Sequence, residues 1–179
     1  MLVACAASQA SPTANLPRYG AEAANLLDDS FSGHLFATAF VPGTAGDDAH
    51  FDDRVRAAQS IWLVKVATVS REGSLGDNRR YSLVFRELET LAGPRSDGPI
   101  PLVVSAKDPS FHWLDRVGGA WVGSEVILLV RNYRSPAGDH ERVAMHFHGE
   151  PSNPELRARI LEIREAERVR ERAAPVPKK

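Results

Sequence analysis

The chain has 179 residues, of which 43% are hydrophobic; this suits one domain with its own core and excludes disorder along the whole length. The 22 basic and 23 acidic side chains nearly cancel, so bulk charge does not favour nucleic acid as a partner. No apolar run approaches the roughly 18 residues that a membrane-spanning helix needs, and the sequence predicts no such helix.

The first residues favour attachment to a membrane through a lipid. Leu2-Val3-Ala4-Cys5 resembles the lipobox of bacterial lipoproteins, in which the cysteine follows the cleavage site and is diacylated. The small and polar residues 6–15 are typical of a tether behind such an anchor. The resemblance implies lipidation at Cys5 and export to the outer membrane or the periplasmic face of the envelope. Only four residues precede Cys5, fewer than the about 7–15 apolar residues of a signal peptide, and the alternative is a frayed apolar N-terminus.

Residues 1–20 are therefore interpreted as anchor and tether, and residues 21–50 as a helical and irregular segment packed on the domain. Its composition predicts a short helix over residues 21–27. Large apolar residues without a regular period then predict an irregular segment over the core; they are Phe31, Leu35, Phe36 and Phe40. Asp52 or Asp53 is predicted to cap a helix that runs to Gln59.

Five segments have the composition of β-strands. They are residues 61–70, the stretch from Tyr81 to the Gly93-Pro94 break, and residues 100–105, 125–133 and 142–148. In the fourth, Val126, Leu128 and Val130 point to one side while Ile127 and Leu129 point to the other. Because apolar groups cover both of its faces, this strand is predicted to be central.

The last helix has the clearest boundary signals. Asn153 is the predicted cap, Pro154 takes the first helical position, and Leu156, Ile160 and Ile163 form an apolar stripe. The charged residues that follow favour a solvated face. With the five strands and the long connection 107–123, this helix predicts a mainly β fold: a five-stranded antiparallel OB-like barrel at residues 51–150, with a short helix before the first strand and a C-terminal helix and tail at 151–179.

Two segments also resemble a known family. Residues 81–93 and 121–131 are similar to strands of the netrin/TIMP-like (NTR-like) OB barrels found in small bacterial exported domains. The resemblance implies this fold over about residues 52–150 and a non-catalytic binding role. Animal members begin with a disulfide-bonded cysteine that reaches a metalloprotease zinc, and the single cysteine here has no disulfide partner. Protease inhibition is therefore not expected.

His146 and His148 are the most suggestive local pair for chemistry. Alternate residues of a strand share a face, so both imidazoles could approach one zinc or copper ion, with Glu150 on the same face as a further ligand. Two ligands do not make a site, and a third would have to come from His140, Asp139 or His112 through folding. In the alternative, both histidines face the terminal helix or water, or hydrogen-bond to neighbouring residues.

No motif identifies a reaction, since the sequence contains no G-x-S-x-G nucleophile elbow and no Lys-Ser or Lys-Thr after its glycine-rich stretch at 118–123. The predicted function is a non-enzymatic, membrane-tethered binding or structural module of the bacterial envelope, with another envelope protein as partner, no nucleic acid and no required cofactor. The alternative is a metal-binding protein that uses His146 and His148.

Overall fold

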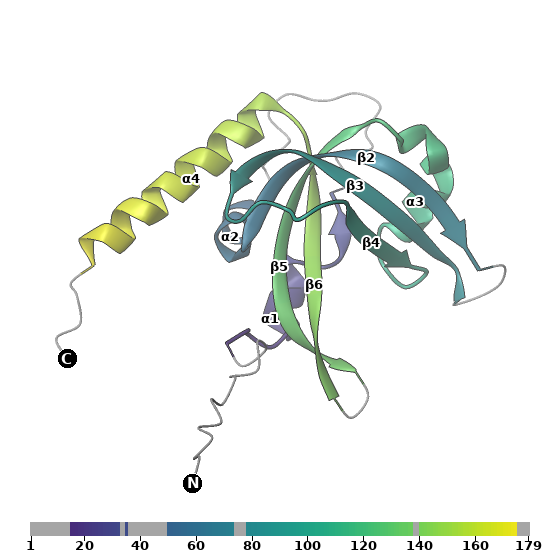
Figure 1. Cartoon of the computed structure of the whole chain (residues 1–179), viewed down its shortest axis with the longest axis horizontal. Helices are drawn as coiled ribbons and strands as arrows, with labels where there is room; N and C mark the ends of the chain where they lie inside the picture. The colour runs from purple at the N-terminus through teal and green to yellow at the C-terminus, as the bar shows by residue number, and fades with distance from the viewer. Residues whose placement is uncertain (1–14, 33–34, 36–49, 74–77, 138–139, 175–179) are drawn as a thin grey trace, which may run out of the picture.

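The computed structural model describes residues 15–32, 35, 50–73, 78–137 and 140–174, and its centre is one six-stranded sheet with the order β1-β6-β5-β2-β3-β4 (Figure 1). The strands are β1 (Ser30–Phe31), β2 (Ser60–Glu72), β3 (Arg80–Ala92), β4 (Ile100–Ser105), β5 (Glu125–Ala137) and β6 (His140–Pro151). The helices are α1 (Ala21–Leu26), α2 (Phe51–Ala57), α3 (Phe111–Val117), the 3-10 turn η3 (Gly118–Trp121) and α4 (Pro154–Ala173).

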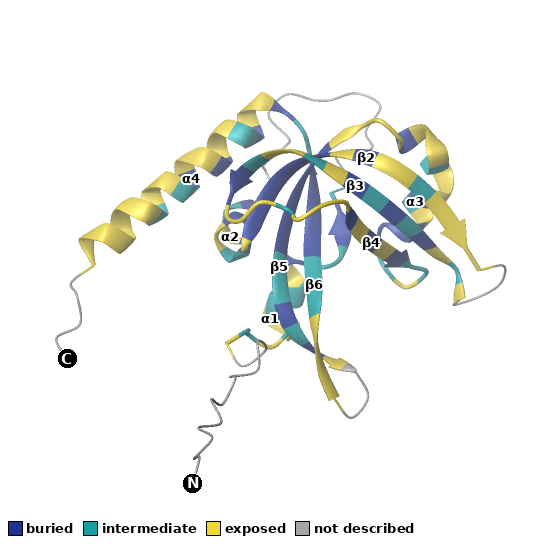
Figure 2. Cartoon of the chain, viewed as in Figure 1, coloured by how far each residue is buried: buried dark blue, intermediate teal, exposed yellow. Residues whose placement is uncertain are grey.

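Strand β5 is central, as its sequence predicts. It pairs antiparallel with β2 along one edge and with β6 along the other. Every residue from Val126 to Val130 is buried, and the dark blue centre of the sheet in Figure 2 follows these strands. Alternation of side chains across β5 therefore divides the core into two clusters, one on each face of the sheet.

The inner cluster is rich in aromatic side chains and lies on the face that carries α3 and η3. Its buried aromatic members are Phe31, Trp62, Tyr81, Phe85, Phe111, Trp121 and Phe147. The outer cluster lies on the opposite face, where α1, α2 and α4 cover the sheet. Leu27, Phe51, Val55, Leu156 and Ile160 supply most of its buried helical side chains. The strongly curved sheet thus has apolar packing on both faces.

The predicted mainly β class is confirmed, but the strands do not form the predicted five-stranded barrel. The sheet has a sixth strand, β1, which runs parallel to β6, and it is not closed. At the other border, β3 is the only strand among the described residues that pairs with β4. The N–H of Phe31 donates to the hydroxyl of Ser110 at 2.7 Å, so the outer side of β1 bonds to the loop before α3 instead of to β4. Phe31 therefore belongs to a strand, where an irregular segment was expected.

Helix α4 begins as predicted. The side chain of Asn153 accepts a hydrogen bond from the N–H of Leu156 at 2.8 Å, and Leu156, Ile160 and Ile163 are buried. The second half of the helix extends beyond the sheet (Figure 1). The predicted cap of α2 is wrong: the helix begins at Phe51, before both aspartates, and ends at Ala57 instead of Gln59. Asp52 and Asp53 lie in its first turn, where their negative charge is favourable at the positive end of the helix dipole.

Replacing Asn153 with alanine is expected to lower the free energy of unfolding by about 1 kcal/mol, because the N–H of Leu156 loses its acceptor in a buried position. Urea denaturation of parent and variant checks this value. Asn153→Asp keeps the acceptor and is the matched control, expected to stay within about 0.5 kcal/mol of the parent. Equal losses in both variants would show that the cap is not the cause.

Candidate functional site

The residues before β1 meet the two histidines predicted as metal ligands. Because β1 pairs in parallel with β6, with Ser30 opposite His148, it brings Asp28 and Asp29 beside β6. We call Asp28, Asp29, His146, His148 and Glu150 the aspartate–histidine network. The three β6 residues share the face of the outer cluster, as alternation predicts.

His148 is the buried centre of this network. Its Nδ1 lies 2.7 Å from Oδ1 of Asp28, and its Nε2 lies 3.3 Å from Oε1 of Glu150, within ion-pair distance but without hydrogen-bond alignment. The side chains of His148 and Glu150 are each only 4% exposed, whereas that of Asp28 is 30% exposed. A charged imidazole between two carboxylates accounts for the burial of Glu150.

His146 has its own set of contacts. Its Nδ1 lies 2.7 Å from Oδ2 of Asp29, and its Nε2 lies 3.0 Å from the hydroxyl of Ser135. Asp29 has a φ of 54°, in the left-handed region, and its other carboxylate oxygen accepts the N–H of Phe147 at 3.1 Å. Tyr19 stacks on the imidazole with ring centroids 3.4 Å apart. Asp29 thus ties the segment before β1 to both the backbone and a side chain of β6.

The network shifts the pKa of two groups in opposite directions. Burial by itself lowers the pKa of His148, but its contacts with Asp28 and Glu150 outweigh burial and the pKa lies above its usual value, against a smaller opposing charge from Arg54. Burial raises the pKa of Asp28, but the contacts with His148 and Ser30 and the charge of Arg54 outweigh it, and the pKa lies below its usual value. An Asp28 carboxylate and a His148 imidazolium stabilise each other.

These contacts bear on the predicted metal site. All four imidazole nitrogens face a protein group, and each histidine pairs with a different aspartate. Within the residues that the structure describes, no three histidine, cysteine, aspartate or glutamate side chains are arranged to hold an ion. Zinc or copper at His146, His148 and Glu150 stays a prediction, and binding would require displacement of these contacts.

The contacts of Ser135, His146 and Asp29 follow the order of a Ser-His-Asp triad. Ser135, however, is only 7% exposed within β5, and Tyr19 covers the imidazole. A reaction at this hydroxyl would require that cover to move. The geometry is better suited to holding the N-terminal segment on β5 and β6, where the N–H of Tyr19 also donates to the carbonyl of Arg134 at 2.9 Å.

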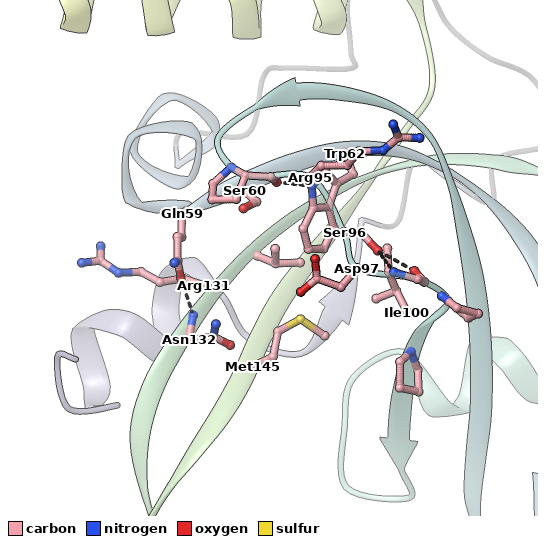
Figure 3. A pocket seen from close by; sticks show the side chains of 15 residues that line it. Gln59, Ser60, Trp62, Arg95, Ser96, Asp97, Ile100, Arg131, Asn132 and Met145 are labelled. Carbon is pink, nitrogen blue, oxygen red and sulfur yellow. Dashed lines mark hydrogen bonds between the residues drawn. The ribbon is translucent and has the colours of Figure 1, made fainter. Parts of the chain in front are cut away.

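A second candidate site is a cleft of about 470 Å³ at the gap in the sheet (Figure 3). One wall comes from β2 and the β3–β4 loop, and the other from β5 and β6. Its apolar lining includes Trp62, Ile100, Val130 and Met145, with Pro94, Pro99 and Pro101; its polar lining includes Gln59, Ser60, Arg95, Ser96, Asp97 and Asn132. The volume lies within the range of small-molecule and side-chain pockets, about 300–1,000 Å³.

The β3–β4 loop is fixed in place at the cleft. The indole N–H of Trp62 donates to the carbonyl of Pro94 at 2.8 Å, and the carboxylate of Glu87 accepts the N–H of Ser96 at 2.6 Å. Gly93 has a φ of 74°, and a Cβ there would lie 2.1 Å from the carbonyl oxygen of Gln59. These contacts hold the loop in position through the protein's own residues, so the cleft is preformed for binding.

No pattern in the sequence predicts the cleft. Its lining comes from four separate strands and one loop, and Trp62 and Met145 look like ordinary core residues in the strand patterns. In the sequence, Gly93-Pro94 indicates only a break between two strands. Cys5, the predicted lipidation site, lies outside the described residues, as do Phe36, Phe40 and Asp139.

Comparison with protein-family models, with curated proteins and with solved structures found no significant match to this chain. In the described ranges, none of the helices combines the length and the apolar content that crossing a bilayer requires.

Proposed function

We propose that the chain is a non-enzymatic binding module of the bacterial envelope, tethered through a lipid on Cys5, and that the cleft holds its partner. The observation that carries the binding role is the cleft of about 470 Å³ at the gap in the sheet, whose lining combines apolar side chains with polar and charged ones. Its loop wall is fixed by Trp62 and Glu87, which reduces the entropy lost on binding.

We also propose that the open sheet is a variant of the NTR-like OB fold. Support comes from the resemblance of residues 81–93 and 121–131, and from the β2–β3 hairpin followed by a helical connection between β4 and β5. In this proposal β1 and Phe31 occupy the space where a closed barrel would bring its last edges together. The NTR-like resemblance implies a binding role, in agreement with the cleft.

The binding role is tested by a photo-reactive amino acid placed at Asn132, on the cleft wall, in the full chain expressed in bacterial envelopes. The same group at Glu162, an exposed residue of α4, is the control. We expect one defined crosslinked envelope protein from position 132 and none from position 162. Equal products from both positions, or none from position 132, would contradict the cleft as the binding surface.

The tether is tested by the mass of the native protein and by fractionation. A diacylated Cys5 adds the mass of its acyl chains and keeps the protein with the membrane pellet, whereas Cys5→Ser is expected to release it to the soluble fraction. A free thiol at Cys5 in the native protein would overturn the lipid anchor but would leave the cleft proposal intact.

A further inference from the structure

The charge inside the cleft is not balanced. The carboxylate of Asp97 points into the cleft (Figure 3), and the described part of the chain gives it no ion pair. Of the two cationic lining residues, Arg95 points away and lies 3.5 Å from Glu87. Arg131 donates to the carbonyl of Ala57 at 2.9 Å, on the opposite face of the sheet. A bound cation would therefore meet an uncompensated carboxylate.

An aromatic ring stands behind this carboxylate. Trp62 lines the cleft, and its indole N–H is already bonded to the carbonyl of Pro94, so its polar edge is satisfied and the rest of the ring is available only for apolar and π contacts. Indole rings attract lysine and arginine head groups more strongly than other aromatic rings do. The thioether of Met145 and the side chain of Ile100 can pack against the methylene stem of such a side chain.

The backbone of β6 favours a polypeptide as the source of the cation. The carbonyls of Phe147 and Gly149 accept bonds from Asp29 and Ser32, so odd-numbered residues of β6 direct their polar backbone groups away from β5. Strand β1 pairs with β6 only at His148 and Gly149. Among the described residues, no strand pairs with this edge of β6 further along, at Val143 and Met145. An extended segment could pair there beside the cleft.

We propose that the cleft receives a lysine or arginine side chain from a partner polypeptide that runs beside β6, with Asp97 as its counter-charge and Trp62 as its aromatic wall. This inference rests on the proposed binding function and adds the chemistry of the partner. It assigns Asp97 to binding, because the exposed carboxylate takes part in none of the contacts that hold the loop.

The test is calorimetric titration of the full chain with short extended peptides that carry lysine, arginine or norleucine at one central position. Norleucine keeps the apolar stem and lacks the charge. We expect the lysine and arginine peptides to bind at least about tenfold more tightly than the norleucine peptide, a difference of about 1.4 kcal/mol. Asp97→Asn should reduce lysine-peptide affinity to the norleucine level. Glu162→Gln, which makes the same charge change on α4, should leave it unaltered.

Equal binding of the norleucine and lysine peptides would overturn the cation inference while leaving the cleft as a binding surface. Unchanged lysine affinity in Asp97→Asn would overturn the role of this carboxylate. If no peptide binds at millimolar concentration, the inference is also overturned, and crosslinking at position 132 then decides the proposed function separately.

Discussion

Replacing Gly149 with alanine is expected to lower the free energy of unfolding by about 2–4 kcal/mol, the range of an overpacked or disrupted core contact. A Cβ on Gly149 would lie 2.1 Å from one ring carbon of Phe31 and 2.7 Å from another. The Phe31 ring cannot move away freely, since its centroid lies 4.8 Å from that of Trp121 and 5.1 Å from that of Phe147. The added methyl group must therefore displace Phe31 and, with it, strand β1.

Chemical denaturation of four proteins measures this effect: the parent, each single variant and the double variant of Gly149→Ala with Phe31→Ala. With the ring removed, the methyl group has space, so Gly149→Ala should cost much less in the Phe31→Ala background. Gly119→Ala is a matched control, because a Cβ there meets nothing within 4 Å. If the losses of unfolding free energy in the two single variants simply add up in the double variant, Gly149 does not contact Phe31, and the position of β1 beside β6 is wrong.

The sequence could predict the elements whose signals are local. The two-sided apolar pattern of 126–130 identified the central strand, and the bounds predicted for β4, residues 100–105, agree with the structure. Asn153 and Pro154 identified the start of α4, because capping chemistry depends on residues within one turn. Each of these signals comes from residues that are close in the sequence.

The features of the structure that the sequence did not predict depend on contacts between segments that are distant in the sequence. Strand β1 has only two residues and pairs in parallel with β6, where Ser30 lies opposite His148, 118 positions later in the chain. A strand this short has no hydrophobic periodicity from which it could be predicted. Without β1, the strand patterns predict five strands that form an OB-like barrel, closed or nearly closed. The strand pattern placed His146 and His148 on one face correctly, but it could not show that Asp29 and Asp28 would meet them. The cleft shares this difficulty, because Trp62, Asp97 and Met145 meet only in the folded chain.

Replacing His148 with alanine is expected to lower the free energy of unfolding by about 3–5 kcal/mol, because removal of one member of a buried ion pair leaves its partner uncompensated. The partner is Glu150, whose side chain is 4% exposed and lies on the same face of β6. Loss of the Asp28 contact also frees the segment before β1. His140→Ala, at an exposed position of the same strand, is the control and should stay within about 0.5 kcal/mol of the parent.

The same network predicts how stability depends on pH. The pKa of His148 is raised in the folded state, so its stabilisation is complete below the unfolded value of about 6.5 and is lost as pH rises through the folded pKa. The pKa of Asp28 is lowered, so its stabilisation is present above about 3.8 and is lost as pH falls through the folded pKa. The network therefore contributes most between about pH 4 and 6.5.

Denaturation of the parent and of His148→Ala at pH 5.5 and at pH 8.5 separates the contribution of His148 to the free energy of unfolding from the contributions of the other ionisable groups. We expect the difference between the two proteins to be larger at pH 5.5, where the imidazolium is fully formed in both the folded and the unfolded parent. A difference that grows towards pH 8.5 would mean that His148 is held neutral in the folded chain. Glu150 would then lack its cation, and the ion pair that the distance between His148 and Glu150 favours would be absent.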